Sequence, residues 1–516
     1  MTTDTDTDTD TLTIFSVNPA QGTSELTHLH ETTSSDVEEI CARAAAAAPH
    51  FEAAGRAGRA VFLRAIADEL ESAREPIVRI AMRETGLPDA RLNGELTRTC
   101  YQMRLFGDVL DEGSYLEATI DHAGDTPMGP GPDLRRMLVP LGPVAVFGAS
   151  NFPLAFSVPG GDTASALAAG SPVVVKAHSS HPETSAACFD ALVRAAAATQ
   201  MPDGVVGIVY GQAAGAALVA DPRITAVGFT GSLGGGKALL DIISRRDDPI
   251  PFYGELASLN PVIVTENAAA ARADEIAAGL VASVTASAGQ LCTKPGLVFV
   301  PTGEAGDALV AELRTALADV DAPVVLNERI RNSYNDISVS LSRSTAVEVR
   351  TTGREAGPEG FRVTPTVLEV NAQALSPEIT EECFGPFAVV ARYDSDEHLR
   401  RGLDVLPASL TATVHSEPGE DDRTSALTEL LRPKAGRLLY NGYPTGVLVS
   451  WAQTHGGPWP ATNTLHTSVG TSAIRRFLRP VTWQDAPASV LPAELQDGDS
   501  AVPRRIDGRL TLPAAG

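Results

Sequence analysis

The stretch ITAVGFTGSLGGGKALLDIIS, residues 224–244, contains the signal that decides the fold. Its first part, Ala226–Thr230, predicts a short buried strand, and Gly234–Ser244 predicts an amphipathic helix. The glycines between them would leave free backbone N–H groups at the start of the helix, where a pyrophosphate binds favourably. The turn has neither a Walker A sequence nor strict GxGxxG spacing, so it is weak evidence when taken alone.

The same strand–helix unit recurs before this stretch. Val144–Phe147, Val173–Lys176 and Val205–Val209 predict strands, and an alanine-rich helical segment follows each of them. This alternation indicates βαβ units around a parallel sheet with helices on both faces. Further strands are expected at Val262–Val264, Gly296–Val300, Val324–Leu326, Ala388–Tyr393 and Ala412–His415. The pattern predicts an α/β protein with two lobes.

Helical spacing dominates the N-terminal part of the chain. Apolar residues recur at helix spacing over Ser35–Met82 and again over Leu92–Leu110. Residues 121–140 are polar, rich in Gly and Pro and then basic, which indicates a protruding hairpin or linker. The chain starts with a Thr-Asp repeat, which we expect to be a disordered acidic arm.

Charge and composition exclude several classes of function. The 516 residues contain 40 Lys and Arg against 64 Asp and Glu, and the net charge of −24 argues against a nucleic-acid partner. Residues 143–159 are apolar but broken by Gly, Asn and Pro, so we expect no membrane partner. The start of the chain does not resemble a signal peptide, and five cysteines lack CxxC spacing. A reducing, cytoplasmic location and the absence of a metal site are therefore expected.

Three segments carry residue types that suit covalent catalysis. Cys292 lies between a helical and a β-like run, and flanking glycines leave room for a substrate at its sulfur. Glu255 is the one charged residue in segment 251–261, where a raised pKa would suit a general base. Asn151 follows a predicted strand and could donate a hydrogen bond to an oxyanion. A buried thiol, a solvated glutamate and a turn asparagine are the ordinary interpretations of the same residues.

The order of the motifs resembles the aldehyde dehydrogenase superfamily over about residues 12–485. The resemblance rests on Asn151, Lys176, the turn Gly231–Gly236, Glu255, Cys292 and the segment Glu382-Cys383-Phe384-Gly385-Pro386. Within the superfamily, ELASLNP at 255–261 and GQLCTKPG at 289–296 resemble the branch of α-ketoglutaric semialdehyde (2,5-dioxopentanoate) dehydrogenases.

The resemblance implies a Rossmann-type cofactor domain, an α/β catalytic domain and a small oligomerisation hairpin that would build a homodimer or homotetramer. The expected ranges are 12–117 with 141–256 for the cofactor domain, 257–465 for the catalytic domain, and 118–140 with 466–489 for the oligomerisation segments. An acidic arm, 1–11, and a C-terminal tail, 490–516, lie outside these domains.

The implied activity is oxidation of an aldehyde to a carboxylic acid with NADP or NAD. Cys292 would attack the aldehyde as a thiolate, Asn151 would hold the oxyanion, and Glu255 would activate the water that releases the acid. The residues carried over as cofactor ligands are Lys176, Ser179, Gly231, Ser232, Gly236, Glu382 and Phe384. Ser179 stands where members that prefer NAD carry a glutamate, so no carboxylate there repels a 2′-phosphate. We therefore expect NADP to be used at least as well as NAD.

The small-molecule substrate is expected beside the helix that contains Arg98 and Gln102, which are four residues apart on one face. Arg98 would pair with the distal carboxylate of 2,5-dioxopentanoate, which would be oxidised to 2-oxoglutarate; an exposed surface arginine is the other interpretation. Phe152 and Phe156 would form the wall of the tunnel or belong to the core. His455-Gly456-Gly457-Pro458-Trp459-Pro460 replaces the family's usual Phe-Gly-Gly segment, so the contacts of this loop are not carried over.

Other functions stay open at this stage. A broad-specificity or fatty-aldehyde dehydrogenase that uses NADP carries similar motifs and would need an apolar tunnel without a committed arginine. A CoA-acylating dehydrogenase generally lacks the base, so Glu255 argues against it. A non-catalytic scaffold or a nucleotide-binding regulatory module would have no use for the set Cys292, Glu255 and Asn151.

Overall fold

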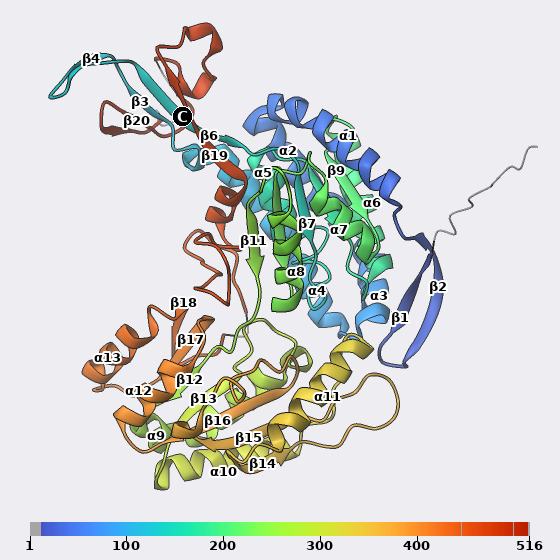
Figure 1. The fold of residues 1–516 in the computed structure, drawn as a ribbon, viewed down its shortest axis with the longest axis vertical. Coiled ribbons are helices and arrows are strands. Elements are labelled where there is room, and N and C mark those ends of the chain that lie inside the picture. Colours follow the sequence, from blue (N-terminus) through green and yellow to red (C-terminus); the bar gives the residue numbers. More distant parts are fainter. Residues whose placement is uncertain (1–11, 445, 499, 514–516) are drawn as a thin grey trace, which may run out of the picture.

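The computed structural model describes residues 12–444, 446–498 and 500–513, and the architecture is α/β (Figure 1). Two sheets, each with helices packed on it, form two lobes, and a smaller sheet projects from the first lobe. The expected acidic arm lies outside the described residues. Within the described ranges, no helix combines the length and the apolar character that crossing a membrane requires.

The first lobe is built on a parallel five-stranded sheet with the order β11-β10-β7-β8-β9. Its strands are β7 (Val144–Phe147), β8 (Val173–Lys176), β9 (Val206–Val209), β10 (Ala226–Thr230) and β11 (Phe252–Glu255). The helices that join them are α5 (Gly161–Ala169), α6 (Pro182–Ala198), α7 (Gln212–Ala220) and α8 (Leu233–Ser244). The strand order reverses between β7 and β10, and ligands of such sheets bind where the order reverses. The strand–helix alternation predicted from the sequence is confirmed here.

The N-terminal segments cover this first sheet. They comprise β1 (Thr13–Asn18), β2 (Thr23–His30), α1 (Ser34–Ala53), α2 (Gly55–Ser72), α3 (Arg74–Thr85) and α4 (Asp89–Glu112). Helix α4 buries Leu92, Leu96 and Met103 against the core of this lobe, and its 24 residues lead from the gap between the lobes to the small sheet. The sequence pattern over 35–82 looks like one continuous helical stretch, but the structure has three helices there, α1, α2 and α3, because the chain bends at Ala54 and Ala73.

The second lobe contains a seven-stranded sheet with the order β14-β15-β16-β13-β12-β17-β18. Its strands are β12 (Val262–Val264), β13 (Leu297–Pro301), β14 (Val347–Thr352), β15 (Thr366–Asn371), β16 (Phe387–Tyr393), β17 (Ser409–His415) and β18 (Ala435–Tyr440). Its helices are α9 (Glu266–Thr285), α10 (Glu304–Ala318), α11 (Glu328–Ser342), α12 (Asp396–Val405) and α13 (Asp421–Leu431). The prediction of a strand at Val324–Leu326 is wrong: Val324 makes one isolated bridge to Arg362, because Asn327 caps α11 directly afterwards.

The small sheet joins segments that are far apart in the sequence. Its order is β19 (Leu478–Gln484), β6 (Leu134–Pro140), β3 (Thr119–Asp121), β20 (Arg504–Ile506) and β21 (Arg509–Thr511). Strands β4 (Gly124–Thr126) and β5 (Gly129–Gly131) form the tip of the hairpin. The sequence analysis predicts no position for the C-terminal tail, and the structure shows that β20 and β21 of the tail extend this sheet. Arg135 pairs with Asp497 and His122 with Asp507, so ion pairs attach the tail to the hairpin.

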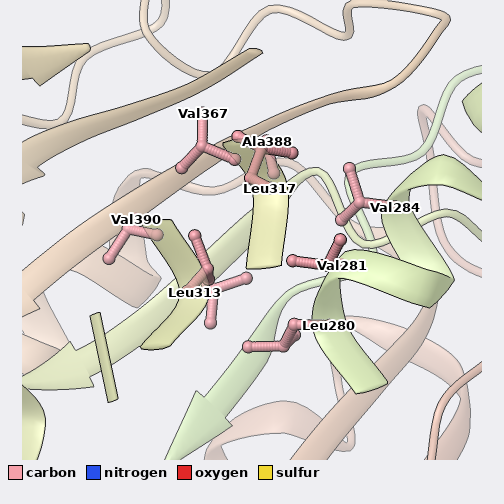
Figure 2. Close-up of a pocket in the computed structure, with 9 residues that line it drawn as sticks. Leu280, Val281, Val284, Leu313, Leu317, Val367, Ala388 and Val390 are labelled. Carbon is pink, nitrogen blue, oxygen red and sulfur yellow. The ribbon is translucent and has the colours of Figure 1, made fainter. Parts of the chain in front are cut away.

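Figure 2 shows a small cavity between α9, α10 and strands β15 and β16 of the second lobe. Its volume is about 10 Å³, and only aliphatic side chains such as Leu280, Leu313 and Val390 line it. Because it offers no polar group to a ligand, we assign it to the packing of the core.

Gly289 allows the two loops around the site to pack closely. Its φ is +66°, and a Cβ atom would overlap the backbone carbonyl of Gly385.

Gly289→Ala is expected to cost about 3 kcal/mol of unfolding free energy, measured by urea unfolding, because backbone atoms would have to move apart. Gly55 is a matched control: its φ is +68° but nothing lies within 4 Å of the added Cβ. Gly55→Ala should cost only about 1–2 kcal/mol, and equal losses in both variants would contradict the packing argument.

Candidate active site

The site lies in a cavity of about 570 Å³ that both lobes line. Asn151, Ser232 and Glu255 come from the first lobe, beyond the carboxyl ends of β7, β10 and β11. Cys292 and Glu382 come from loops of the second lobe. The structure therefore brings the predicted catalytic residues and part of the predicted cofactor set to one place, where the strand order of the first sheet reverses.

A chain of polar contacts connects the nucleophile and the base. His455 Nε2 lies 3.5 Å from Cys292 Sγ and 3.0 Å from Glu255 Oε1. Ser468 Oγ donates to the other carboxylate oxygen of Glu255 over 3.0 Å. Glu255 is 3% exposed and His455 1%, so these contacts are shielded from solvent. The last residue of β11 thus holds its side chain in one orientation beside the thiol.

The pKa values of these groups follow from burial and from their partners. Burial raises the pKa of the Cys292 thiol well above its ordinary value, and the Glu255 charge acts in the same direction, so the resting sulfur is a protonated thiol. For Glu255, burial also raises the pKa, but the contacts with His455 and Ser468 outweigh it and lower the pKa. The expectation of a raised pKa for Glu255 is wrong, because the contacts with His455 and Ser468 stabilise the charged form of the carboxylate. The resting site therefore pairs a thiol with a carboxylate that can accept its proton.

Asn260 fixes the loop that carries the nucleophile. Its Nδ2 donates to the backbone carbonyl oxygens of Cys292, over 2.8 Å, and Lys294, over 3.0 Å. The Asn260 Oδ1 accepts from Ser258 Oγ and from Thr411, so each end of the amide is fully used. Asn260 itself is fully buried with a φ of +50°, a conformation that asparagine tolerates better than most residues. This contact explains why the segment after Glu255 ends in asparagine.

Asn151 lines the same cavity as Cys292. Its Nδ2 donates to the Gln290 carbonyl oxygen over 2.8 Å, which leaves one amide hydrogen for a ligand in the cavity. Gln290 in turn accepts a hydrogen bond from the backbone of Leu326 through its side chain. The amide is therefore held in place before a substrate arrives.

The glycine turn lines the cavity at the start of α8. Ser232 is the N-cap of this helix and accepts from the Gly235 N–H over 3.2 Å. A Cβ at Gly234 would meet nothing within 4 Å, whereas at Gly236 it would overlap Leu256, which packs there. The open backbone at Gly234, next to a helix N-terminus, fits a pyrophosphate; Gly231 lines the same cavity, but a Cβ there would overlap the Phe229 ring.

The remaining predicted cofactor residues are divided, since Lys176 and Ser179 are not among the residues that line the cavity. Glu382 and Phe384 line the cavity, and Glu382 accepts from the Ser258 N–H; burial raises its pKa to about 7. Lys176 ends β8 and is partly buried, and burial followed by the charge of Arg329 lowers its pKa, while Glu31 acts in the opposite direction. Ser179 is exposed.

The four residues predicted to bind the substrate are not among those that line this cavity, but Phe156 lies close to His455. The rings of Phe156 and His455 are 6.4 Å apart, and the Arg98 guanidinium lies 5.1 Å from the Phe156 ring centre. Phe152 packs edge-to-face on Phe156. Gln102 is buried with an unpartnered Nε2 close to Gly161.

Arg98 has an unusual environment for an arginine. Its Nε donates to the Val447 carbonyl oxygen, but its two terminal nitrogens are buried and have no partner among the described residues. Burial lowers its pKa to about 10, so the guanidinium stays charged at neutral pH. The alternative interpretation, an exposed surface arginine, is therefore wrong. A buried cation with two free donors can accept a carboxylate.

Sequence reasoning missed three residues of the site. His455 and Ser468 hold Glu255, and Arg437 on β18 lies close enough to Cys292 to lower its pKa slightly. Of the three, only His455 could have been suspected from the sequence, because the segment that it begins departs from the family's usual Phe-Gly-Gly segment. Both terminal nitrogens of Arg437 already donate to backbone carbonyl oxygens, of Pro444 and Gly446, so it is less available than Arg98.

Comparisons with known proteins agree with this arrangement. The model of the aldehyde dehydrogenase family matches residues 6–459. The chain is 46% identical over 482 residues to alpha-ketoglutaric semialdehyde dehydrogenase 2 of Azospirillum brasilense, with 92% of this chain and 91% of the relative covered. It is 41% identical over 462 residues to alpha-ketoglutaric semialdehyde dehydrogenase of Acinetobacter baylyi, with 88% and 87% covered. The solved structure of 1-pyrroline-5-carboxylate dehydrogenase from Thermus with bound NAD has a similar fold, with a TM-score of 0.77 at 21% identity, and 91% and 89% covered.

The environments of the five cysteines predict selective chemical labelling. Cys41, Cys100, Cys188 and Cys383 are buried, whereas Cys292 is partly exposed in the cavity. Iodoacetamide should therefore modify one thiol per folded chain, as counted by intact mass, and peptide mapping should place the label on Cys292. Cys292→Ser should remove the labelling. Comparable labelling of any buried cysteine in the folded protein would contradict the assignment.

Proposed function

The chain belongs to the aldehyde dehydrogenase family, and we propose that it oxidises 2,5-dioxopentanoate, an aldehyde with a carboxylate at its far end, to 2-oxoglutarate. Oxidation of an aldehyde with a nicotinamide cofactor is the activity of this family. Two relatives that align with nearly the whole chain are named for α-ketoglutaric semialdehyde, which is the same compound. The cavity described above fits the cofactor, because the open backbone of Gly234 at the start of α8 lines the same cavity as Cys292.

The observation that carries this proposal is the buried guanidinium of Arg98. Its two terminal nitrogens have no partner among the described residues, and leaving such donors unsatisfied costs about 1–3 kcal/mol or more for a charged group. A carboxylate of the substrate would satisfy both donors in a bidentate pair. Phe156 lies between Arg98 and His455, so an aldehyde whose carboxylate reaches Arg98 would extend towards Cys292. A fatty aldehyde would leave the donors unpaired.

Carbon–sulfur bond formation begins the reaction. Glu255 accepts the proton of the Cys292 thiol as the sulfur attacks the aldehyde carbon, and the negative charge moves to the aldehyde oxygen. The free amide hydrogen of Asn151 and the backbone N–H of Cys292 donate to this oxygen. A bound oxidised nicotinamide supplies the acceptor for a hydride, one hydrogen with two electrons, from the same carbon. Cys292 then carries the acyl group as a thioester.

Glu255 also serves the release of the acid. It loses the first proton to solvent and takes another from a water molecule, whose oxygen attacks the thioester carbon. The carbon–sulfur bond breaks, the carboxylic acid leaves, and the sulfur of Cys292 takes the proton from Glu255 and is again a thiol. His455 and Ser468 keep the carboxylate of Glu255 ionised and oriented in this step. The presence of this base argues against transfer of the acyl group to a thiol.

The substrate proposal predicts how Arg98 affects specificity. Purified protein should oxidise 2,5-dioxopentanoate with a much higher kcat/KM than pentanal, measured as the formation of reduced cofactor. Arg98→Met should lower kcat/KM for 2,5-dioxopentanoate about 30-fold, which corresponds to about 2 kcal/mol for a lost charge-assisted pair, and should leave pentanal nearly unchanged. Arg104→Met is the matched control, since Arg104 lies on the same helix but pairs with Asp68 at the surface. Equal losses for both aldehydes in Arg98→Met would reject Arg98 as the carboxylate ligand.

For the cofactor, we propose that NADP is used at least as well as NAD. Ser179 offers no carboxylate to repel a 2′-phosphate, and Arg329 adds a second cation near Lys176. The ratio of kcat/KM for the two cofactors should therefore favour NADP or be near one. Ser179→Glu should shift this ratio towards NAD by about tenfold or more, because it restores a carboxylate beside the adenosine ribose. A strong preference of the unmodified protein for NAD would contradict the proposal.

We also expect the chain to assemble through its small sheet into a homodimer or homotetramer. Strand β19 forms one edge of this sheet, and the tail strands β20 and β21 cover the other. An edge strand with free backbone groups is a natural place for pairing with another chain. The domain ranges and the oligomeric state stay predictions.

A further inference from the structure

The three side chains at the centre of the site have a second chemical property. Cys292 Sγ, His455 Nε2 and a carboxylate oxygen of Glu255 all lie within 4.8 Å of one another. Among the described residues, this is the only group of three or more His, Cys, Asp or Glu side chains with such spacing. Thiolate, imidazole and carboxylate are the three ligand types that zinc takes in proteins.

The separations suit a tetrahedral zinc ion. With Zn–S distances of about 2.3 Å and Zn–N distances of about 2.0–2.1 Å, sulfur and nitrogen ligands of one tetrahedron lie about 3.5 Å apart. Cys292 Sγ and His455 Nε2 are 3.5 Å apart. Nitrogen and oxygen ligands should lie about 3.4 Å apart, and His455 Nε2 and Glu255 Oε1 are 3.0 Å apart. The observed nitrogen–oxygen distance is about 0.4 Å shorter than this, so binding requires only a small separation of the two groups.

Burial and charge favour a divalent cation at this position. A thiolate and a carboxylate together balance the two positive charges of the ion, and the imidazole binds in its neutral form. The side chains of His455 and Glu255 are already immobilised by burial and by Ser468, so binding orders little that is mobile. Cys292 borders the cavity, which leaves the fourth tetrahedral position open to water.

We propose that Cys292, His455 and Glu255 form a binding site for Zn²⁺, and that its occupation inhibits the enzyme reversibly. Binding forms a Zn–S bond and releases the thiol proton to solvent. It occupies both the sulfur that attacks the aldehyde and the carboxylate that accepts protons. His455 Nδ1 has no hydrogen-bond partner among the described residues, so no hydrogen bond to the second ring nitrogen fixes the orientation of the imidazole for the metal. The site should therefore bind Zn²⁺ more weakly than structural zinc sites do, and a chelator should restore activity.

The site is tested on the full-length protein without aldehyde or cofactor, so its failure is distinct from failure of the proposed function. Co²⁺ serves as the spectroscopic probe. Its addition should produce a thiolate-to-cobalt charge-transfer band in the near ultraviolet and visible bands with the intensity of tetrahedral coordination. Zn²⁺ should abolish these bands by displacement and should protect Cys292 from iodoacetamide.

Variants separate the three-ligand site from binding by the thiol alone. His455→Phe keeps an aromatic ring but removes the nitrogen ligand, and it should weaken Zn²⁺ binding at least tenfold in calorimetric titration. His466→Phe is the matched control, since His466 is exposed nearby and touches Tyr253, and it should bind Zn²⁺ like the unmodified protein. Cys292→Ser should lose the charge-transfer band. Unchanged affinity in His455→Phe, or no charge-transfer band in the unmodified protein, would overturn the proposal.

Discussion

The hydrogen bonds of Asn260 are the constraint on which the active site depends. The catalytic base ends a strand of the first lobe, whereas the nucleophile lies on a loop of the second, 37 residues later in the chain. Asn260 follows Glu255 by five residues and donates to the carbonyl oxygens of Cys292 and Lys294. Because the amide is fully buried and fully paired, moving the nucleophile loop would leave several polar groups unsatisfied. One side chain thereby fixes the nucleophile loop to the segment that follows the base in the chain.

The pKa values of Cys292 and Glu255 depend on the contacts among Cys292, Glu255 and His455. A buried thiol beside a carboxylate holds its proton firmly, and a buried carboxylate on its own would do the same. The imidazole of His455 changes this balance, since it lowers the pKa of Glu255 and leaves the carboxylate able to accept protons. The same closeness of sulfur, nitrogen and oxygen that serves proton transfer also gives the spacing of a zinc ligand set. Catalysis and inhibition by a metal would then share one geometric cause.

The net charge of −24 looks unfavourable for an enzyme that binds an anionic cofactor and an anionic substrate. The structure places cations where these anions would lie. Arg329 lines the cavity and its charge acts on Lys176, and the Arg98 guanidinium lies over the ring of Phe156, which is close to His455. Burial strengthens such local charges, because the low dielectric screens them less than water screens the acidic surface. The overall charge of the chain therefore says little about the potential inside the site.

The sequence by itself determined the strand–helix alternation and the order of the motifs, and it predicted Cys292, Glu255 and Asn151 as the catalytic residues. These are local patterns, set by periodicity and by residue types within short segments. In the two large sheets it missed β11, β14, β15 and β18, and it predicted a strand at 324–326 where the chain makes one bridge. It also gave the wrong direction for the pKa of Glu255.

Only the tertiary structure decided that His455, 200 residues after Glu255, lies against both the base and the nucleophile. The same holds for the free donors of Arg98 and for the tail that joins the small sheet. The physical reason is that pKa values, ligand spacing and unsatisfied donors depend on distances between residues that are remote in the sequence. Those distances are fixed by packing of the two lobes, and no local pattern in the chain encodes them.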